Sequence, residues 1–324
     1  PPQPTNFKKW DRIARRITKN DMTCMKFEVG GKVSLRSLMS HGAVPRIYRP
    51  AVWYFLITHR LRDMEIDHAL VDIYQELKCI SSEHRSRIEN DLHTIGFPEA
   101  TITAVQNVLT GFGNYNTTVG YQEVMLGPVL LLLENFSEEF AFVCLTHLFR
   151  RYNLQNLLSP DSTLPLTLCT SLDRLLQAQA PPLAAHLEFL GIKSAEVAKD
   201  WFRTLFSTVL GRNHGTVSRL FELWLAMESW DFWVAVAYGV LRLWWDGKGD
   251  QNNHRKSIIR SPQSYSAPQL IQSLQDFQPE IRDSEKFVNG IMSVYVGTKR
   301  SEGATSLGQR LTSSNKKRQS VLVP

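Results

Sequence analysis

Cysteine is scarce in this chain of 324 residues, and its four cysteines form no CxxC pair. They lie far apart, at Cys24, Cys79, Cys144 and Cys169. This spacing argues against a disulfide framework and a zinc site, and it favours a reduced intracellular setting. Cys144 lies inside the apolar stretch EFAFVCLTHLF, where a small core residue is expected.

Long apolar runs are also absent. The longest candidates, PVLLLL and WVAVAYGVLRLWW, fall short of the roughly 18 apolar residues of a membrane span. The first residues, PPQPTNFKKWD, carry no apolar segment of a secretory signal. Apolar residues make up 43% and charged residues 21% of the chain, as in ordinary soluble globular proteins. We therefore expect a cytoplasmic protein without a membrane span.

Excess positive charge is missing from the body of the chain and is concentrated at its ends. Residues 1–32 hold eight Lys or Arg against three acids, and residues 297–324 hold six against one, so each end carries +5. Because the whole chain carries +6, residues 33–296 are near −4, which argues against a nucleic-acid-binding face there. Basic ends are typical of solubilising arms. The alternative is peripheral contact with an anionic membrane surface, such as an endomembrane, or with an acidic partner.

The motifs of several enzyme classes do not occur. There is no phosphate-binding GxGxxG or GxxxxGK[ST], no HExxH and no GxSxG. The nine histidines show no metal-ligand spacing, and His147 is expected to be a core histidine. The six tryptophans between Trp201 and Trp245 follow helical patterns that indicate packing. The sequence therefore predicts neither a cofactor nor a metal site.

What the chain does contain is helical periodicity from residue 34 onward, with no alternation long enough for a sheet. DHALVDIYQELKCI, for example, has apolar residues at the i, i+3, i+4, i+7 positions of one helix face. VAKDWFRTLFSTVL, residues 197–210, is expected to be one helix of the second half. The pattern predicts an all-α array of two helical lobes, about 33–180 and 181–296, divided at a Pro-Pro break.

The two ends are predicted to differ from this body. Residues 1–32 read as a basic arm with one short helix, in which Trp10, Ile13 and Ile17 fall on one face. Residues 297–324 are rich in Ser, Thr, Gly, Lys and Arg, and are predicted to form a disordered basic tail.

Several segments follow one another in a recognisable order across residues 33–296. They are GAVPRIYRPAVWYFLI, YQEL, IENDLHTIGFP, GYQEVM, SEEFAFVCLTHLF, HLEFLGI, WFRTLFSTVL and SRLFELWLAM. Their order and spacing resemble those of the TBC domain, the helical module of Rab GTPase-activating proteins. Arg49 and Trp53 match structural positions of the family's first motif. The resemblance implies a two-lobed helical fold whose partner is a Rab-type small GTPase.

In active members of that family, two side chains enter the active site of the bound GTPase. An arginine lies three residues after the Asp that matches Asp91, and a glutamine lies two residues after the Tyr that matches Tyr121. The arginine neutralises charge on the transferred phosphoryl group, and the glutamine orients the attacking water.

This sequence departs from the family at both finger positions. Thr94 stands in place of the arginine and Glu123 in place of the glutamine, while Val124 replaces the following glycine. An ionised carboxylate would face the anionic triphosphate and could not donate a hydrogen bond. No catalytic finger is therefore intact. The resemblance assigns the following positions to GTPase binding: Asp91, Thr94, Tyr121, Gln122 and Glu123.

Purely structural roles would also explain the same residues. Glu123 at a helix start is also favourable beside the positive end of a helix dipole, and Asp91 is equally consistent with a helix-end or buried-pair residue. A one-residue shift would bring Gln122 to the glutamine position, but no such shift supplies an arginine.

Three function classes remain. The favoured one is a degenerate TBC-domain protein that binds a Rab-like GTPase or a partner complex and regulates membrane traffic or GTPase signalling without efficient catalysis. The second is an active Rab GTPase-activating protein with non-standard finger residues. The third is a structural subunit that docks a coiled-coil helix of a partner, as does the small TBC-domain subunit of the tuberous sclerosis complex. The segment from Pro45 to Trp53 resembles that subunit's version of the first motif.

Overall fold

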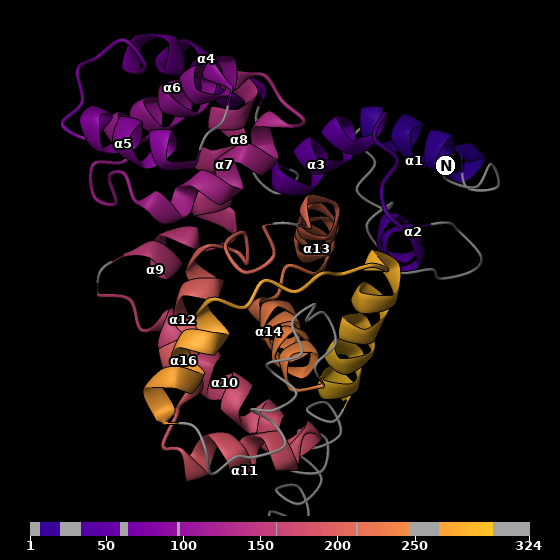
Figure 1. Cartoon of the computed structure of the whole chain (residues 1–324). Helices are drawn as coiled ribbons and strands as arrows, with labels where there is room; N and C mark the ends of the chain where they lie inside the picture. The colour runs from indigo at the N-terminus through magenta and orange to yellow at the C-terminus, as the bar shows by residue number, and fades with distance from the viewer. Residues whose placement is uncertain are drawn as a thin grey trace, which may run out of the picture.

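The computed structural model describes residues 7–19, 34–58, 64–95, 98–159, 161–211, 213–246 and 266–300. Within these ranges every regular element is a helix (Figure 1). The prediction of an all-α helical array is therefore confirmed. Cys24 lies outside the described residues.

The helices up to residue 158 are as follows: α1 (Phe7–Thr18), α2 (Leu35–His41), α3 (Arg49–Thr58), α4 (Met64–Leu77), α5 (Arg85–Ile95), α6 (Glu99–Tyr115), the 3-10 helix η3 (Glu123–Met125), α7 (Leu126–Leu133), α8 (Glu138–Arg151) and α9 (Leu154–Leu158). The later ones are α10 (Leu164–Gln179), α11 (Pro181–Phe189), α12 (Ser194–Arg203), α13 (His214–Met227), α14 (Trp230–Trp245) and α16 (Ala267–Gln275). A last helix spans residues 284–300.

Several helix ends lie where the local sequence predicts them. α2 follows Ser34, whose Oγ accepts a hydrogen bond from the Ser37 N–H at 3.1 Å, and it ends at Gly42. α7 has Pro128 in its first turn, where the missing proline N–H leaves no intrahelical bond unmade. α11 begins at Pro181, which separates it from α10.

The N-terminal helix is part of the folded body. The predicted short helix is confirmed as α1, which buries Trp10, Ile13 and Ile17 and packs on α3. Tyr48 stacks on Trp10 with ring centroids 6.4 Å apart. The description of residues 1–32 as an arm is therefore wrong for α1, because its apolar face has a partner surface on the body.

The helices form two groups, with α3 to α8 in one and α10 to α16 in the other (Figure 1). α10 precedes the predicted boundary near residue 180, yet it packs on α11, α12 and α14. α13 packs on α2 and α3 as well as on α14, and so connects the groups. The predicted lobes 33–180 and 181–296 need correction for this reason: the division precedes α10, and one continuous hydrophobic core underlies both groups.

The predicted helix over residues 197–210 is interrupted. α12 ends at Arg203, and Leu205 and Phe206 adopt left-handed backbone conformations with φ of 45° and 63°. Such conformations cost about 1–3 kcal/mol each in non-glycine residues. Phe206 is buried and stacks on Trp233, with ring centroids 5.2 Å apart. Aromatic packing offsets the strain of this turn.

The last helix continues through residue 300, four residues into the segment 297–324 that composition predicts to be disordered. The Lys299 ammonium forms an ion pair with Asp231 at the start of α14, which ties the end of this helix to the body. Residues 301–324 lie outside the described residues.

The core confirms three predictions about single residues. Cys144 is fully buried, and His147 is buried with its Nε2 atom 2.7 Å from Asp67 Oδ1. The tryptophans pack as the helical patterns predict. Those that are buried are Trp201, Trp224, Trp233 and Trp244.

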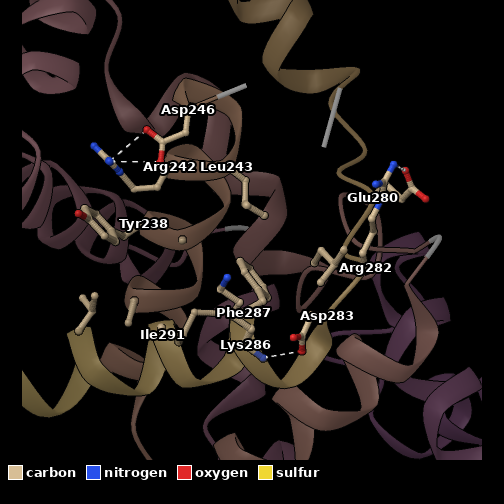
Figure 2. Close-up of a pocket in the computed structure, with 15 residues that line it drawn as sticks. Tyr238, Arg242, Leu243, Asp246, Glu280, Arg282, Asp283, Lys286, Phe287 and Ile291 are labelled. Carbon is tan, nitrogen blue, oxygen red and sulfur yellow. Dashed lines mark hydrogen bonds and ion pairs between the residues drawn. The ribbon is translucent and has the colours of Figure 1, made fainter. Parts of the chain in front are cut away.

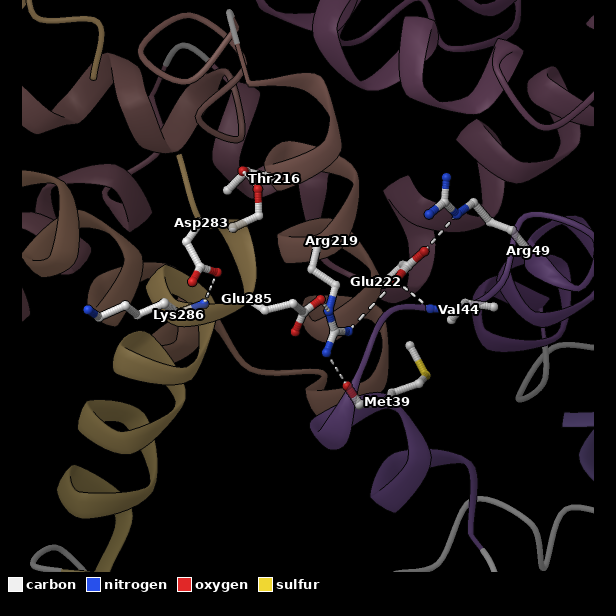
Figure 3. A network of polar contacts seen from close by, with 10 residues as sticks. Met39, Val44, Arg49, Thr216, Arg219, Glu222, Asp283, Glu285 and Lys286 are labelled. Atoms are coloured by element: carbon white, nitrogen blue, oxygen red, sulfur yellow. Dashed lines mark hydrogen bonds and ion pairs between the residues drawn. The ribbon is translucent and has the colours of Figure 1, made fainter. Parts of the chain in front are cut away.

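A buried ion network holds α3 and the segment after α2 against α13 (Figure 3). The Glu222 side chain on α13 has 0% exposure. Its Oε1 accepts a hydrogen bond from Arg49 Nε at 2.7 Å, and its Oε2 accepts one from the Val44 N–H at 3.2 Å. Burial raises the pKa of Glu222, while the neighbouring guanidinium groups oppose that shift.

Arg219, one turn before Glu222, extends the network. Its Nη1 lies 3.7 Å from Glu222 Oε2, and its Nε lies 3.3 Å from Glu285 Oε1 on the last helix. It also donates to the Met39 carbonyl at the end of α2. Four separate segments therefore meet at one pair of side chains.

Arg49 and Trp53 occupy neighbouring positions at this junction. Trp53 is fully buried and lies against Phe221 of α13, with ring centroids 5.1 Å apart. The Arg49 guanidinium lies 5.8 Å from the centroid of the Trp53 ring. Both residues of the first motif therefore hold α3 against α13.

Candidate functional site

Asp91 on α5 and Tyr121, just before η3, lie side by side. The Tyr121 hydroxyl donates a hydrogen bond to Asp91 Oδ2 at 2.8 Å. α6 runs between them in sequence and packs on α5, which returns the chain to the same place. Two positions that the resemblance assigns to GTPase binding therefore lie in contact.

Tyr121 is buried rather than exposed, with 3% of its surface accessible. Burial, and after it the hydrogen bond to Asp91, raises the pKa of the phenol. The ring centroid lies 6.5 Å from that of His84. Tyr121, which the resemblance assigns to GTPase binding, is therefore not on an exposed face: its ring is packed beneath the surface and supports the site from below.

The residue before Tyr121 adopts a backbone conformation that favours glycine. Gly120 has φ +62°, and a Cβ atom there would lie 2.8 Å from His84 Nε2. Any other side chain would meet both a strained backbone and a steric clash. Gly120 thus fixes the point from which the chain passes Tyr121 and enters η3.

Gln122 is held at both ends of its amide. Nε2 donates to the Leu158 carbonyl at 2.6 Å, and Oε1 accepts from Arg203 Nη2 at 3.0 Å. To act as the catalytic glutamine of the family, this side chain would have to break both bonds. The contacts instead give Gln122 a structural position between η3, α9 and α12.

Glu123 begins η3 with an exposed side chain. Among the described residues, no hydrogen-bonding or ion-pairing group contacts this carboxylate. Val124 beside it is half-buried. Thr94 lies in the last turn of α5, three residues after Asp91, and its side chain is outside the described part of the structure. The outer surface of the site therefore carries an unengaged carboxylate.

A cavity of about 620 Å³ adjoins Glu123. It lies between α7 and the chain that connects α12 to α13, and its apolar wall includes Leu130 and Val217. Three carboxylates line it, from Glu123, Glu134 and Asp200, against the single guanidinium of Arg203. This sign of charge disfavours an anionic phosphate ligand.

Two arginines near the site were not predicted from the sequence. Arg87 is exposed on α5, and its Cζ lies 5.6 Å from the centroid of the Tyr121 ring. Arg87 lies one helical turn before Asp91, and this spacing places both side chains on one face of α5. The spacing could have indicated from the sequence that Arg87 lies near the site. Arg203 contacts Gln122 and lies 3.9 Å from Asp200, so its charge is engaged locally.

A second cavity, of about 720 Å³, lies between α14 and the last helix (Figure 2). Four of its charged side chains pair with one another: Arg242 lies 3.1 Å from Asp246, and Arg282 lies 3.6 Å from Glu280. None of the predicted site residues lines it. The candidate site is therefore the surface around Asp91 and Glu123, not this cavity.

Two other kinds of feature are absent from the described ranges. No group of three or more His, Cys, Asp or Glu side chains there is arranged to hold a metal ion. None of the helices in the same ranges is long and apolar enough to span a bilayer.

Comparison with known proteins identifies the family and the fold. Residues 47–246 match the family model of the Rab-GTPase-TBC domain. This chain belongs to that family. Members of the family interact with Rab GTPases and regulate them. The resemblance seen in the sequence is thus confirmed.

Relatives of this TBC domain are much longer proteins. The GTPase-activating protein GYP5 of Eremothecium gossypii is 31% identical over 166 residues, which are 51% of this chain and 19% of that protein. The Rab GTPase-activating protein eat-17 of Caenorhabditis elegans is 27% identical over 217 residues, 64% of this chain and 23% of that protein. The chain therefore spans about a fifth of the length of these relatives.

Solved structures share the fold. The TBC domain of a Chlamydomonas flagellar RabGAP superposes with a TM-score of 0.59 at 20% identity, covering 90% of this chain and 95% of the other. The Ypt/Rab-GAP domain of Gyp1p gives a TM-score of 0.64 at 16% identity, with 89% and 98% covered. The similarity extends along nearly the whole length of both domains.

Proposed function

We propose that this TBC domain binds a Rab-like small GTPase, or a complex that contains one, and regulates membrane traffic or GTPase signalling without efficiently catalysing GTP hydrolysis. The observation that carries this proposal is the exposed, unengaged carboxylate of Glu123 at the glutamine position, above the Asp91–Tyr121 pair. We propose that the GTPase contacts Asp91, Thr94 and Glu123 at the surface, while Tyr121 and Gln122 support them from beneath.

The chemistry of phosphoryl transfer explains why catalysis is lost. Charge develops on the transferred phosphoryl group and must be met by a positive or hydrogen-bond-donating side chain. Thr94 carries no charge, and an ionised Glu123 accepts hydrogen bonds but donates none. Loss of an arginine finger alone forfeits about 10³ to 10⁵ in rate, or about 4–7 kcal/mol of barrier lowering.

The residues that position the chain at the entry to η3, in contrast, are all present. Gly120 and Tyr121 direct the chain into η3, and Tyr121 anchors it to Asp91 on α5. A binding surface that retains its frame but lacks catalytic groups is suited to recognition of the GTPase. For this reason binding is the part of the family's activity that we propose to persist.

Arg87 favours a second candidate function, an active GTPase-activating protein with a substitute finger. Its guanidinium is exposed and lies over Tyr121, on the same helix as Thr94. A substitute arginine still leaves the site without a glutamine, because both ends of the Gln122 amide are bonded internally. Arg87→Ala in a hydrolysis assay would distinguish this candidate: it would abolish any acceleration that depends on Arg87.

The binding part of the proposal is tested with a panel of purified Rab proteins loaded with GDP or a GTP analogue. We expect at least one loaded Rab to bind, and Glu123→Lys to weaken that binding about tenfold or more through a charge change at the contact. Glu188→Lys, at an exposed position on α11, is the matched control and should bind like the original chain. Equal binding by both variants would place the interface elsewhere.

The catalytic part is tested by restoring the fingers. Thr94→Arg combined with Glu123→Gln and Val124→Gly should accelerate hydrolysis by a bound Rab by about a hundredfold or more. The same triple variant with lysine at residue 94 should recover far less, because lysine lacks the planar fork of arginine. If the arginine variant folds and binds the Rab without activating it, the groove assignment fails. Docking of a coiled-coil partner helix on another face would then be the better account.

A further inference from the structure

α1 presents a strongly basic outer surface. Residues 7–19 contain six Lys or Arg against one acid, Asp11. The apolar face of the helix is turned to the body, so the basic residues are left on the outside. These residues are the exposed Lys8, Lys9, Arg12, Arg15 and Lys19 and the half-buried Arg16, and we call them the α1 surface.

Three basic side chains of the α1 surface, those of Lys8, Arg12 and Arg15, have no ion-pair partner on the described part of the body. The carboxylate of Asp11 is engaged by the Tyr48 hydroxyl. Among the described residues, no carboxylate lies within ion-pair distance of Lys8, Arg12 or Arg15. Five of the six basic side chains line a single shallow groove of about 350 Å³ together with Asp11. The charge is thus concentrated on one side of one helix.

Exposed apolar side chains lie at the N-terminal end of the same surface. Phe7, at the start of α1, is 38% exposed, and Ile47 is 76% exposed. Ile47 precedes Tyr48, whose ring centroid lies 6.4 Å from that of Phe7 and whose hydroxyl contacts Asp11. Ile47 follows the exposed Arg46, so the basic and apolar character continue across this turn.

We infer that the α1 surface binds the anionic headgroups of a phospholipid bilayer. α1 is about 18 Å long, so its cations can contact several headgroups at once. Long basic side chains reach the phosphates, while Phe7 and Ile47 enter the boundary between headgroups and acyl chains. An acidic protein would satisfy the cations, but it would leave two exposed apolar side chains without a matching environment. The bilayer provides both.

This inference goes beyond GTPase binding and does not depend on it. The α1 surface contains none of the residues proposed to contact a GTPase. A bilayer assay without GTPase can therefore fail or succeed independently of the proposed function.

The test is sedimentation of the full chain with vesicles of phosphatidylcholine alone or with about 30% phosphatidylserine. We expect binding to the anionic vesicles only, weakened by added salt. Each basic side chain near an anionic surface contributes about fivefold to partitioning. Lys8→Gln with Arg12→Gln and Arg15→Gln should therefore weaken binding about a hundredfold.

A matched variant changes charge by the same amount elsewhere. Arg174→Gln with Lys199→Gln and Arg282→Gln removes three exposed basic side chains of the second group and should bind like the original chain. Failure of the original chain to bind anionic vesicles would overturn the inference. Equal loss of binding in both triple variants would also overturn it, because the effect would then reflect net charge alone.

The apolar contribution has its own control. Ile47→Ser should weaken vesicle binding several-fold, whereas Phe189→Ser, at a position that is 74% exposed on α11, should leave it unchanged. Circular dichroism verifies that each variant retains its helices. Binding that is insensitive to Ile47→Ser and to the α1 charge variant would assign the membrane contact to another part of the chain, against the inference.

Discussion

Two glutamates in this TBC domain have opposite surroundings. Glu222 is fully buried and bonded to Arg49 and to the Val44 N–H, with Arg219 close by. Glu123 is exposed, and no described side chain contacts its carboxylate. The first glutamate joins the two helical groups, and the second occupies the position at which we propose that the family's catalytic glutamine is replaced. On this proposal the supporting structure is maintained while the reactive surface has changed.

The two positions differ in how much a substitution changes the free energy of unfolding. Removal of one partner of a buried ion pair leaves an uncompensated charge in the interior. Replacement of an exposed side chain changes the free energy of unfolding by only about 0.5 kcal/mol or less. The residue at position 123 can therefore change without loss of the structure, whereas the Glu222 network cannot change one member at a time.

The largest predicted effect is at Glu222. Glu222→Ala should lower the free energy of unfolding by about 3–5 kcal/mol, because the half-buried Arg49 would lose its carboxylate partner and the buried Arg219 would keep only Glu285. Glu123→Ala is the control and should change it by less than about 0.5 kcal/mol. Denaturant unfolding of both variants measures the contrast. Similar changes in the free energy of unfolding for the two variants would show that the burial of Glu222 does not make it more important for stability than Glu123.

Tyr121 lies between these extremes. Tyr121→Phe should lower the free energy of unfolding by about 2 kcal/mol, because a buried hydroxyl loses its bond to a carboxylate. Tyr238→Phe is the matched control, since its half-buried hydroxyl contacts the Gln179 carbonyl at a longer distance, 3.3 Å. Chemical denaturation should rank Tyr121 clearly above Tyr238. The reverse ranking would show that the hydrogen bond between Asp91 and Tyr121 does not stabilise the fold.

High pH sharpens the same comparison. The pKa of Tyr121 is raised above its ordinary value of 10.0, so above that pH the unfolded chain releases a proton that the native state retains. Ionisation in the unfolded state favours unfolding, by about 1.4 kcal/mol per pH unit above pH 10. The stability advantage of the original chain over Tyr121→Phe should therefore shrink between pH 10 and pH 11. A constant difference would contradict the burial of this phenol.

The smallest effect is expected from the single change Glu123→Gln. It restores the finger glutamine, but the arginine position is still Thr94, so hydrolysis by a bound Rab should change less than about threefold. Single-turnover hydrolysis of radiolabelled GTP is the measurement. A large gain from this one substitution would mean that Arg87 already acts as the arginine.

Much of the frame follows from local sequence. The helices, the stops at Gly42 and Pro181, and the inward face of α1 are set by periodicity and by residues within one turn. The turn at Leu205 and Phe206 is not, because its left-handed conformation depends on Trp233 in a different helix. A contact between residues so far apart in the chain cannot be predicted from the local sequence pattern.

The candidate site, too, could be predicted from the sequence only in part. Asp91 and Tyr121 could be brought together through the resemblance to the family, and the structure confirms their contact. The burial of Tyr121 and the two bonds of Gln122 could not, because neither follows from the spacing of residues around η3. Arg49 and Glu222 are 173 residues apart, so their pairing is visible only in three dimensions.

The most direct test of the account is single-turnover GTP hydrolysis by each Rab that binds, measured with this chain in saturating excess. With no arginine at residue 94 and a carboxylate at residue 123, we predict acceleration of less than about tenfold over the Rab alone. Acceleration of about a thousandfold would contradict the claim that an intact frame here supports a site without catalytic fingers.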